Sequence, residues 1–221
     1  MLGIMLGKFI TFEGVDGSGK TKQAEFLANT LNTNGIKTHL LREPGGTIFG
    51  EKVRNLILGT NDISAFTEVL LFFAARNELF EKEISTALSR GEYIICDRFY
   101  DSTIVYQGFF KNTDIEKIMQ LKNIVFGNFE PDLTIIMDIN EKLAIERVLK
   151  RKSENTQTSE DKFDSIDENY YKTIIDGYKR IAEIFSYRTK LVKANKPFNI
   201  IAENIKRIVE KKFNLNLKEE S

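Results

Sequence analysis

Short apolar runs alternate along this chain with longer segments in which apolar residues recur every three or four positions. Runs rich in β-branched and aromatic residues predict strands at residues 8–13, 36–42, 92–97, 133–138 and 189–194. Helical spacing predicts helices between these strands and after the last one, including residues 67–88, 114–126, 141–150, 163–185 and 200–213. Strands joined by helices form parallel sheets, because each connection must cross over the sheet. The pattern predicts an α/β fold with a parallel central sheet of about five strands and helices on both faces.

One stretch lacks any apolar period. Residues 152–160 read Lys-Ser-Glu-Asn-Thr-Gln-Thr-Ser-Glu, a polar composition that favours a mobile loop. An ordinary surface loop would have the same composition. A functional role for this stretch is therefore favoured only if a phosphate-binding site lies nearby. At 221 residues the chain is long enough for one α/β domain and too short for two ordinary ones. We expect a single domain over residues 1–221.

The composition of the chain bears on three questions: whether it binds nucleic acid, whether it associates with a membrane and whether it forms disulfides. Because 32 basic and 32 acidic side chains cancel, no overall field would hold a nucleic-acid backbone, and we expect no nucleic-acid partner. No stretch approaches the roughly 20 apolar residues needed to span a bilayer, and the apolar residues 1–6 lack a basic leader, so we expect no membrane association. The single Cys96 excludes an internal disulfide and a cysteine-based metal cluster, which favours a cytoplasmic location.

A glycine-rich segment after the first strand carries the most specific motif. It fits G-x-x-x-x-G-K-[ST] in full and reads Gly14-Val15-Asp16-Gly17-Ser18-Gly19-Lys20-Thr21. In such a P-loop the backbone N–H groups and the start of the following helix face phosphate oxygens. Lys20 would reach the β- and γ-phosphates of ATP, and the Thr21 hydroxyl would bind Mg²⁺. We expect residues 14–21 to bind ATP within a P-loop NTPase fold.

A second feature lies at the end of the third predicted strand. The apolar run there ends in Asp97, and Arg98 follows at once. Many P-loop proteins hold Mg²⁺ or its waters with a carboxylate in this position. Because ligands bind outside the carboxyl ends of parallel strands, Asp97 and Arg98 could handle metal and phosphate together. An ordinary Asp–Arg pair on the surface is the alternative.

With these residues assembled, the sequence resembles the thymidylate kinases, which act on dTMP, along nearly its whole length. The resemblance rests on segments in a fixed order: Phe12-Glu13-Gly14-Val15-Asp16-Gly17-Ser18-Gly19-Lys20-Thr21, Arg42-Glu43-Pro44-Gly45-Gly46-Thr47, Leu70-Leu71-Phe72-Phe73-Ala74-Ala75-Arg76, Asp97-Arg98, Ser102-Thr103, Tyr106-Gln107-Gly108 and Pro131-Asp132-Leu133-Thr134. It implies phosphoryl transfer from ATP to dTMP, Mg²⁺ as cofactor and a homodimer packed through helices that include the one around Phe72.

The resemblance also implies roles in binding the acceptor. Phe72 and Arg76 lie four residues apart on one helix face, and in the family such a pair stacks on thymine and hydrogen-bonds its edge. Spacing alone would equally allow Phe72 in the core and Arg76 in solvent. Asp16 corresponds to the acid that accepts a hydrogen bond from the acceptor's 3′-hydroxyl. Arg42, Arg54 and Arg98 resemble the residues that bind the acceptor's phosphate. Ser102, Tyr106 and Gln107 resemble the residues that line the sugar and the base.

The polar stretch resembles the lid of the family, at about residues 150–163. Arg147, Lys150 and Arg151 share one face of the preceding helix and could converge on phosphates, although a solvated basic face would have the same spacing. One family branch has a catalytic arginine in the P-loop where this chain has Gly17. The resemblance therefore implies a lid arginine, with Arg151 the first candidate and Arg147 the second. The family's lid pattern is Asp-Arg-hydrophobic-acid, and this chain has Asp161-Lys162-Phe163-Asp164 at that place. Lys162 keeps the positive charge of the expected arginine but cannot form two parallel hydrogen bonds to a phosphate.

We expect a thymidylate kinase in which Lys20, Asp97, Arg98 and a lid arginine carry the catalysis. One alternative is a P-loop kinase for another nucleotide or nucleoside. Another is a nucleotide-dependent regulatory ATPase, which would need no acceptor pocket. Phe72 with Arg76 and the basic lid oppose that alternative, and the Asn-Lys-x-Asp segment of a switch GTPase is absent from the chain.

Overall fold

A parallel β-sheet forms the centre of the computed structural model, which describes residues 7–154 and 168–218. Within these ranges the sheet has five strands in the order β2-β3-β1-β4-β5, all neighbours being parallel. The strands are β1 (Phe9–Glu13), β2 (Thr38–Arg42), β3 (Tyr93–Asp97), β4 (Leu133–Asp138) and β5 (Thr189–Lys193). The predicted parallel sheet is confirmed, and each strand lies within or close to its predicted range.

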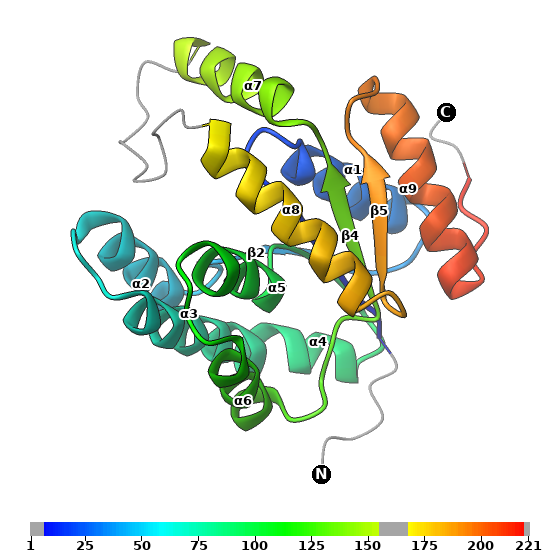
Figure 1. Ribbon diagram of the computed structural model, residues 1–221. Helices are drawn as coiled ribbons and strands as arrows, with labels where there is room; N and C mark the ends of the chain where they lie inside the picture. The colour runs from blue at the N-terminus through cyan, green and yellow to red at the C-terminus, as the bar shows by residue number, and fades with distance from the viewer. Residues whose placement is uncertain (1–6, 155–167, 219–221) are drawn as a thin grey trace.

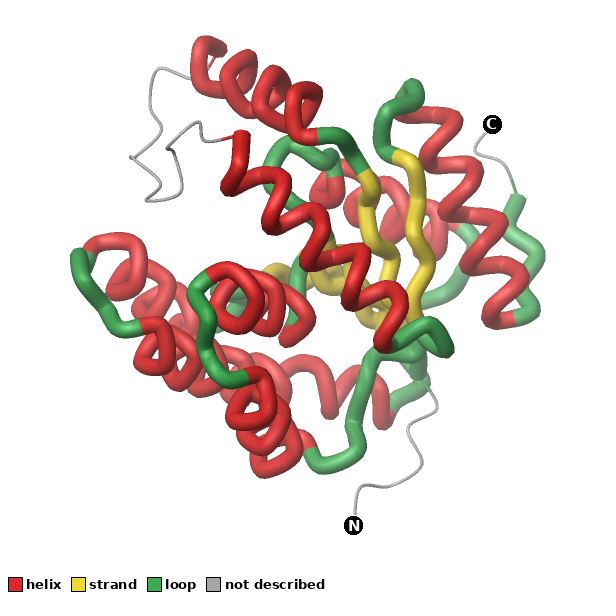
Figure 2. The backbone as a smooth tube through the Cα atoms, viewed as in Figure 1, coloured by secondary structure: helices red, strands yellow, loops and turns green. Residues whose placement is uncertain are grey.

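The burial of the strands explains why they appear as apolar runs in the sequence. The central strand β1 is buried at all five positions, because helices cover both faces of the sheet. The edge strands β2 and β5 are buried only at some positions. Helices α1 (Lys20–Thr33) and α9 (Phe198–Phe213) pack on one face, and α8 (Glu168–Ile184) packs on β4 and β5 from the other (Figure 1). Figure 2 shows the strands enclosed between these helices.

A second group of helices lies beside the sheet. It includes α2 (Ile48–Gly59), α3 (Ala65–Leu79) and α6 (Ile115–Phe126). The predicted helix at 67–88 is one helical run in which α3 continues through the π-helical segment η1 (Phe80–Ile84) into α4 (Ser85–Ser89). Helix α2 packs along α3, and α3 packs on α6.

One helical segment has no counterpart in the sequence prediction. Helix α5 (Tyr100–Thr103) continues directly into the π-helical segment η2 (Ile104–Phe110). The buried pair Asp101–Arg188 joins α5 to the start of β5, with Nη1 and Nη2 of Arg188 each 2.7 Å from a carboxylate oxygen. Segment η2 packs against α8, α6 and α3, which places Tyr106 and Gln107 between these helices.

The helix before the polar stretch is longer than predicted. Helix α7 (Glu141–Glu154) runs four residues beyond the predicted end at residue 150, so Arg151 is helical. Residues 155–163 of the expected lid, with Asp161, Lys162 and Phe163, lie outside the described residues, as does Asp164. No helix in the described ranges combines the length and the apolar character that crossing a membrane would require.

Candidate active site

The loop between β1 and α1 is shaped by glycines with positive φ. Gly17 has φ +82°, and a Cβ atom at this residue would lie 2.3 Å from the carbonyl oxygen of Ala144. A side chain at position 17 is therefore excluded both by the backbone conformation and by the start of α7. Gly19, with φ +87°, leads into α1 at Lys20, so the N–H groups of the first turn face the loop. The predicted strand, P-loop and helix are all present.

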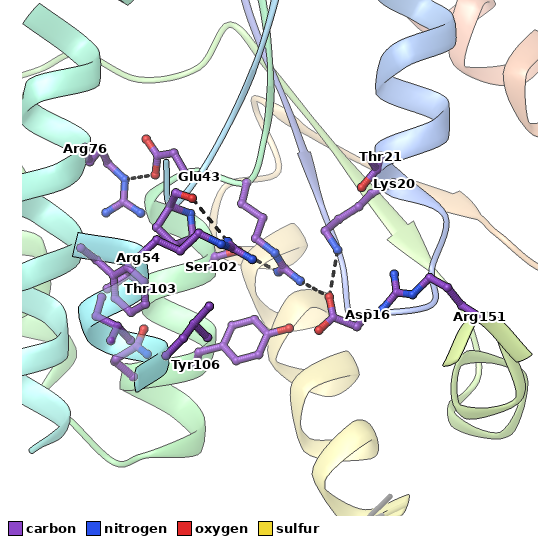
Figure 3. A pocket seen from close by; sticks show the side chains of 16 residues that line it. Asp16, Lys20, Thr21, Glu43, Arg54, Arg76, Ser102, Thr103, Tyr106 and Arg151 are labelled. Atoms are coloured by element: carbon purple, nitrogen blue, oxygen red, sulfur yellow. Dashed lines mark hydrogen bonds and ion pairs between the residues drawn. The ribbon is translucent and has the colours of Figure 1, made fainter. Parts of the chain in front are cut away.

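Two cations converge on Asp16 within this loop. Lys20 Nζ lies 3.2 Å and Arg98 Nη2 lies 2.6 Å from Asp16 Oδ1. Burial by itself would raise the pKa of Asp16, but Lys20 and Arg98 hold this pKa well below its usual range. Burial and the nearby Arg98 lower the pKa of Lys20. Figure 3 shows the Lys20 and Asp16 side chains directed toward each other. The loop thus carries a carboxylate that stays ionised between two cations.

Arg98 takes up an unusual backbone conformation at the end of β3. Its φ is +74°, a region that residues with a Cβ seldom adopt, while its N–H donates to the carbonyl oxygen of Phe12 at 2.9 Å. Its Nη1 donates to Ser102 Oγ at 3.2 Å and to Tyr178 OH at 3.0 Å. These bonds, with the one to Asp16, orient a guanidinium that also lies over the Tyr106 ring.

The carboxylate of Glu13 lies beneath this arrangement and was not predicted as part of the site. It accepts hydrogen bonds from Phe99 N–H at 2.7 Å, Ser102 Oγ at 2.6 Å and Tyr178 OH at 3.1 Å. Burial, followed by repulsion from Asp101, raises the pKa of Glu13 to about 7. The available signal was an acidic residue at the end of an otherwise apolar strand, within the matched segment that leads into the P-loop.

Thr21 and Asp97 meet beside the P-loop. The Thr21 hydroxyl donates to Asp97 Oδ2, while the buried Asp97 Oδ1 has no hydrogen-bond partner in the described part of the chain. A hydroxyl next to an unpartnered carboxylate oxygen fits a hard divalent cation such as Mg²⁺. The described residues contain no cluster of three or more His, Cys, Asp or Glu side chains able to hold a metal. Thr21 and Asp97 are thus the described residues that would hold such a cation.

A cleft of about 250 Å³ brings most of the predicted residues together. From the first part of the chain its lining includes Asp16, Lys20, Thr21, Arg54, Phe72 and Arg76. From the second part it includes Arg98, Ser102, Tyr106, Gln107 and Arg151. In Figure 3, Arg151 and Tyr106 lie on opposite sides of Asp16. The cleft is thus lined by P-loop, strand-end and α3 residues, with a basic residue of α7 at its border.

Arg76 is held by an acid that was not predicted to act in the site. Its Nε lies 2.5 Å from Glu43 Oε2, and both side chains are buried. Arg76 Nη1 and Glu43 Oε1 have no hydrogen-bond partner among the described residues. Phe72 precedes Arg76 by one helical turn and lines the same cleft. The acid lies in the matched segment from Arg42 to Thr47, but no local pattern pairs it with a residue of α3.

Several predicted residues are not part of the cleft lining, namely Asp97, five residues of the P-loop, Arg42 and Arg147. Arg42 is exposed and forms an ion pair with Glu51 at 2.8 Å. Arg147 donates to two backbone carbonyl oxygens, that of Gly17 at 3.4 Å and that of Ala194 at 3.0 Å. Arg147 therefore joins α7 to the P-loop backbone, whereas Arg151, one turn later, lines the cleft.

Comparison with known proteins agrees with this geometry. The family model described as thymidylate kinase matches residues 12–205. The chain belongs to the thymidylate kinase family. A thymidylate kinase of Ruthia magnifica is 38% identical over 206 residues, which are 92% of this chain and 98% of that protein. One of Caldanaerobacter subterraneus is 40% identical over 189 residues, covering 85% of this chain and 88% of that protein. Membership gives the chain the activity of an ATP-dependent nucleoside-monophosphate kinase.

A solved structure of the family supports the fold. The crystal structure of thymidylate kinase from Ehrlichia chaffeensis superposes with a TM-score of 0.73 at 32% identity, covering 92% of this chain and 98% of that one. The P-loop, the Asp97-Arg98 pair and the residues of α3 all fall within the span matched by the family model. The predicted family and P-loop NTPase fold are therefore confirmed.

Replacing Glu13 with Gln should change how stability depends on pH. The pKa of Glu13 is about 7 in the folded protein against an ordinary 4.5, so the folded state binds this proton more tightly than the unfolded chain does. The resulting stabilisation is complete below pH 4.5 and is lost as the pH rises to 7. Over this window the free energy of unfolding of the wild type minus that of Glu13→Gln should fall by about 3 kcal/mol.

Urea unfolding at four pH values between 5 and 8 measures this difference. The amide preserves the shape of the side chain, and the Ser102 and Tyr178 hydroxyls can turn to accept from its nitrogen. Groups that titrate alike in both proteins cancel. A difference that stays constant across the range would contradict the raised pKa of Glu13.

Proposed function

We propose that the chain transfers the γ-phosphoryl group of ATP to dTMP, giving dTDP and ADP for dTTP synthesis. The observation that carries the proposal is that Lys20 of the P-loop, Arg98, Phe72 and Arg76 all line the same cleft. Phosphoryl transfer requires little covalent chemistry from a protein and depends on position and electrostatic stabilisation. A cleft that binds a triphosphate on one side and a nucleotide on the other meets this need.

On the donor side, we assign the P-loop, residues 14–21, to ATP. Lys20 exchanges its bond with Asp16 for the β- and γ-phosphates, and the N–H groups at the start of α1 donate to phosphate oxygens. Thr21 and Asp97 are assigned to Mg²⁺, which when bound would offset the charge of the phosphates. The unpartnered Asp97 Oδ1 supports this assignment.

On the acceptor side, we assign the dTMP phosphate to Arg98, assisted by Arg54 and by Arg42 once the latter leaves Glu51. Asp16 is assigned to the 3′-hydroxyl, since its ionised carboxylate can accept that hydrogen bond while Lys20 and Arg98 offset its charge. The residues assigned to the sugar and the base are Phe72, Arg76, Ser102, Tyr106 and Gln107.

For the charge that develops on the transferred group, we assign Arg151 of the lid as the first candidate and Arg147 as the second. Position 17 has no room for an arginine, because a Cβ there would meet the Ala144 carbonyl. Arg147 is engaged by the carbonyls of Gly17 and Ala194, whereas Arg151 lines the cleft and is exposed. Closure of the lid, about residues 150–163, would exclude water and prevent hydrolysis of ATP.

We further infer a homodimer of single-domain chains, located in the cytoplasm. Large apolar side chains that are at least 40% exposed lie on α2 and α3, which pack together; they are Ile48, Phe49, Leu56, Phe66 and Leu70. An isologous contact between two copies would cover this face. The one cysteine, Cys96, is buried and unbridged, which fits a reducing compartment.

Purified protein with Mg-ATP should phosphorylate dTMP faster than dUMP, dCMP, dGMP or AMP. The cleft has room and hydrogen-bonding groups for one nucleotide beside the P-loop, and coupled measurement of ADP release gives kcat/KM for each acceptor. Lys20→Ala should abolish turnover with the fold intact, which circular dichroism checks. Equal rates with all five acceptors would refute the dTMP assignment, and hydrolysis that no acceptor stimulates would favour the regulatory ATPase.

Arg151→Ala should lower kcat by about 100-fold or more while changing KM for either substrate less than tenfold, because its charge acts mainly in the transition state. Arg147→Ala is the matched variant, one turn earlier on α7. It should mainly weaken ATP binding, because its bonds support the P-loop backbone. Steady-state kinetics separate the two effects, and a small change of kcat in Arg151→Ala would move the role to Arg147 or Lys162.

Leu70→Glu should convert the dimer to a monomer, because a charge among the exposed apolar side chains of α2 and α3 opposes their burial in an interface. Light scattering during size-exclusion chromatography gives the molar mass. Ile200→Glu is the control, since this exposed side chain lies on α9, which packs on α1 and β5 and not on α2 or α3. A monomeric wild type at micromolar concentration, or equal masses for wild type and Leu70→Glu, would count against the proposed interface.

A further inference from the structure

A buried acid lies behind Gln107 and has no part in the roles assigned so far. Glu68 of α3 is 7% exposed and accepts a hydrogen bond from Gln107 Nε2 at 3.2 Å. Lys111 Nζ, at the end of η2, lies 2.8 Å from Glu68 Oε1 and 2.6 Å from Oε2. Glu68 is also in the first turn of α3, where the helix dipole favours a negative charge. Lys111 thus pairs with both carboxylate oxygens of Glu68, and Gln107 donates to one of them.

The carboxylate oxygens of Glu68, which pair with Lys111, determine which way the Gln107 amide faces. An ionised carboxylate only accepts hydrogen bonds, whereas an amide has a donating NH₂ end and an accepting carbonyl end. Gln107 must therefore direct its nitrogen toward Glu68, because the opposite orientation would set two acceptors against each other in a buried site. Gln107 is 2% exposed, yet it lines the cleft. Its Oε1 is thus the amide atom left to accept from a molecule bound there.

A second buried pair fixes a donor on the same cleft. Glu43 holds Arg76 through Nε, and Arg76 Nη1 has no hydrogen-bond partner in the described part of the chain. The base region of the cleft therefore carries a fixed donor from Arg76 and a fixed acceptor from Gln107. A 2,4-dioxopyrimidine presents the complementary pair, an accepting C4 carbonyl and a donating N3–H. A 4-aminopyrimidine presents the reverse, a donating amino group and an accepting N3.

We propose that Glu68 is a positioning residue which, by holding the amide of Gln107, selects 2,4-dioxopyrimidine nucleotides over 4-aminopyrimidine nucleotides. The proposal rests on the proposed function, since it takes the cleft as the site of the acceptor's base. Lys111 contributes by pairing with the carboxylate and does not itself orient the amide. When a residue that can also donate replaces Glu68, the Gln107 amide can turn over and offer its NH₂ group to the accepting N3 of a cytosine ring.

Glu68→Gln tests this role, because the substituted amide can either donate to Gln107 or accept from it. The measurement is kcat/KM at pH 8 for dTMP, dUMP and dCMP, together with calorimetric dissociation constants for the three nucleotides. The ratio of dTMP to dCMP should fall about tenfold or more, as expected when a pocket no longer opposes the wrong hydrogen-bonding pattern. The ratio of dTMP to dUMP should not change, because thymine and uracil share the N3–H and the C4 carbonyl.

Lys111→Gln is the matched control, because it breaks the same ion pair but keeps the accepting carboxylate. It should retain the wild-type ratio of dTMP to dCMP. The double variant Glu68→Gln with Lys111→Gln leaves neither charge unpaired, and it should lose selectivity as Glu68→Gln does even where the single variant is unstable. Thermal unfolding of each variant identifies those that fold.

The outcomes separate the two levels of the proposal. A wild type that does not prefer dTMP over dCMP would refute the proposed function and this inference together. A selective wild type whose Glu68→Gln and double variants keep the same ratio of dTMP to dCMP would refute the positioning role alone. Loss of selectivity in Lys111→Gln equal to that in Glu68→Gln, or a parallel fall in the ratio of dTMP to dUMP, would also overturn the positioning role, because either would indicate general damage to the pocket.

Discussion

Glu13 lies fully buried at the carboxyl end of the central strand, where its carboxylate accepts hydrogen bonds from groups of two other segments. Phe99 N–H and Ser102 Oγ belong to the segment after β3, and Tyr178 OH belongs to α8. A buried carboxylate is costly unless such donors are in place, so the three segments are held in one arrangement. Arg98 shares two of these hydroxyl partners, and its position in the cleft therefore depends on the same carboxylate.

The same physical device recurs around the cleft. Four polar groups that line the cleft are each bonded to an acid: Arg98 and Lys20 to Asp16, Arg76 to Glu43 and Gln107 to Glu68. The acids offset positive charge that would otherwise repel before phosphates arrive, and they limit the orientations of the groups they hold. Such preorganisation suits a reaction whose catalysis is mainly positional and electrostatic.

The sheet was predictable because parallel strands covered on both faces are rich in apolar residues, as β1 and β4 are. The helices on the outside of the sheet were predictable from their amphipathic spacing. Segment η2 was not, since it packs between helices, five of its seven residues are buried, and it lacks a polar face. The end of α7 was placed too early, because its last turn is charged and offers no apolar position to extend the period.

The sequence by itself determined the sheet, the P-loop and the pair Asp97 and Arg98, because these depend on local spacing and on the rule that ligands bind at the carboxyl ends of parallel strands. Only the tertiary structure decided which acidic side chains hydrogen-bond the residues of the site. Glu43 and Arg76 are 33 residues apart, Glu68 and Gln107 are 39, and Glu13 and Tyr178 are 165. A buried acid is stabilised by whichever donors the fold brings to it, and no local pattern contains that information.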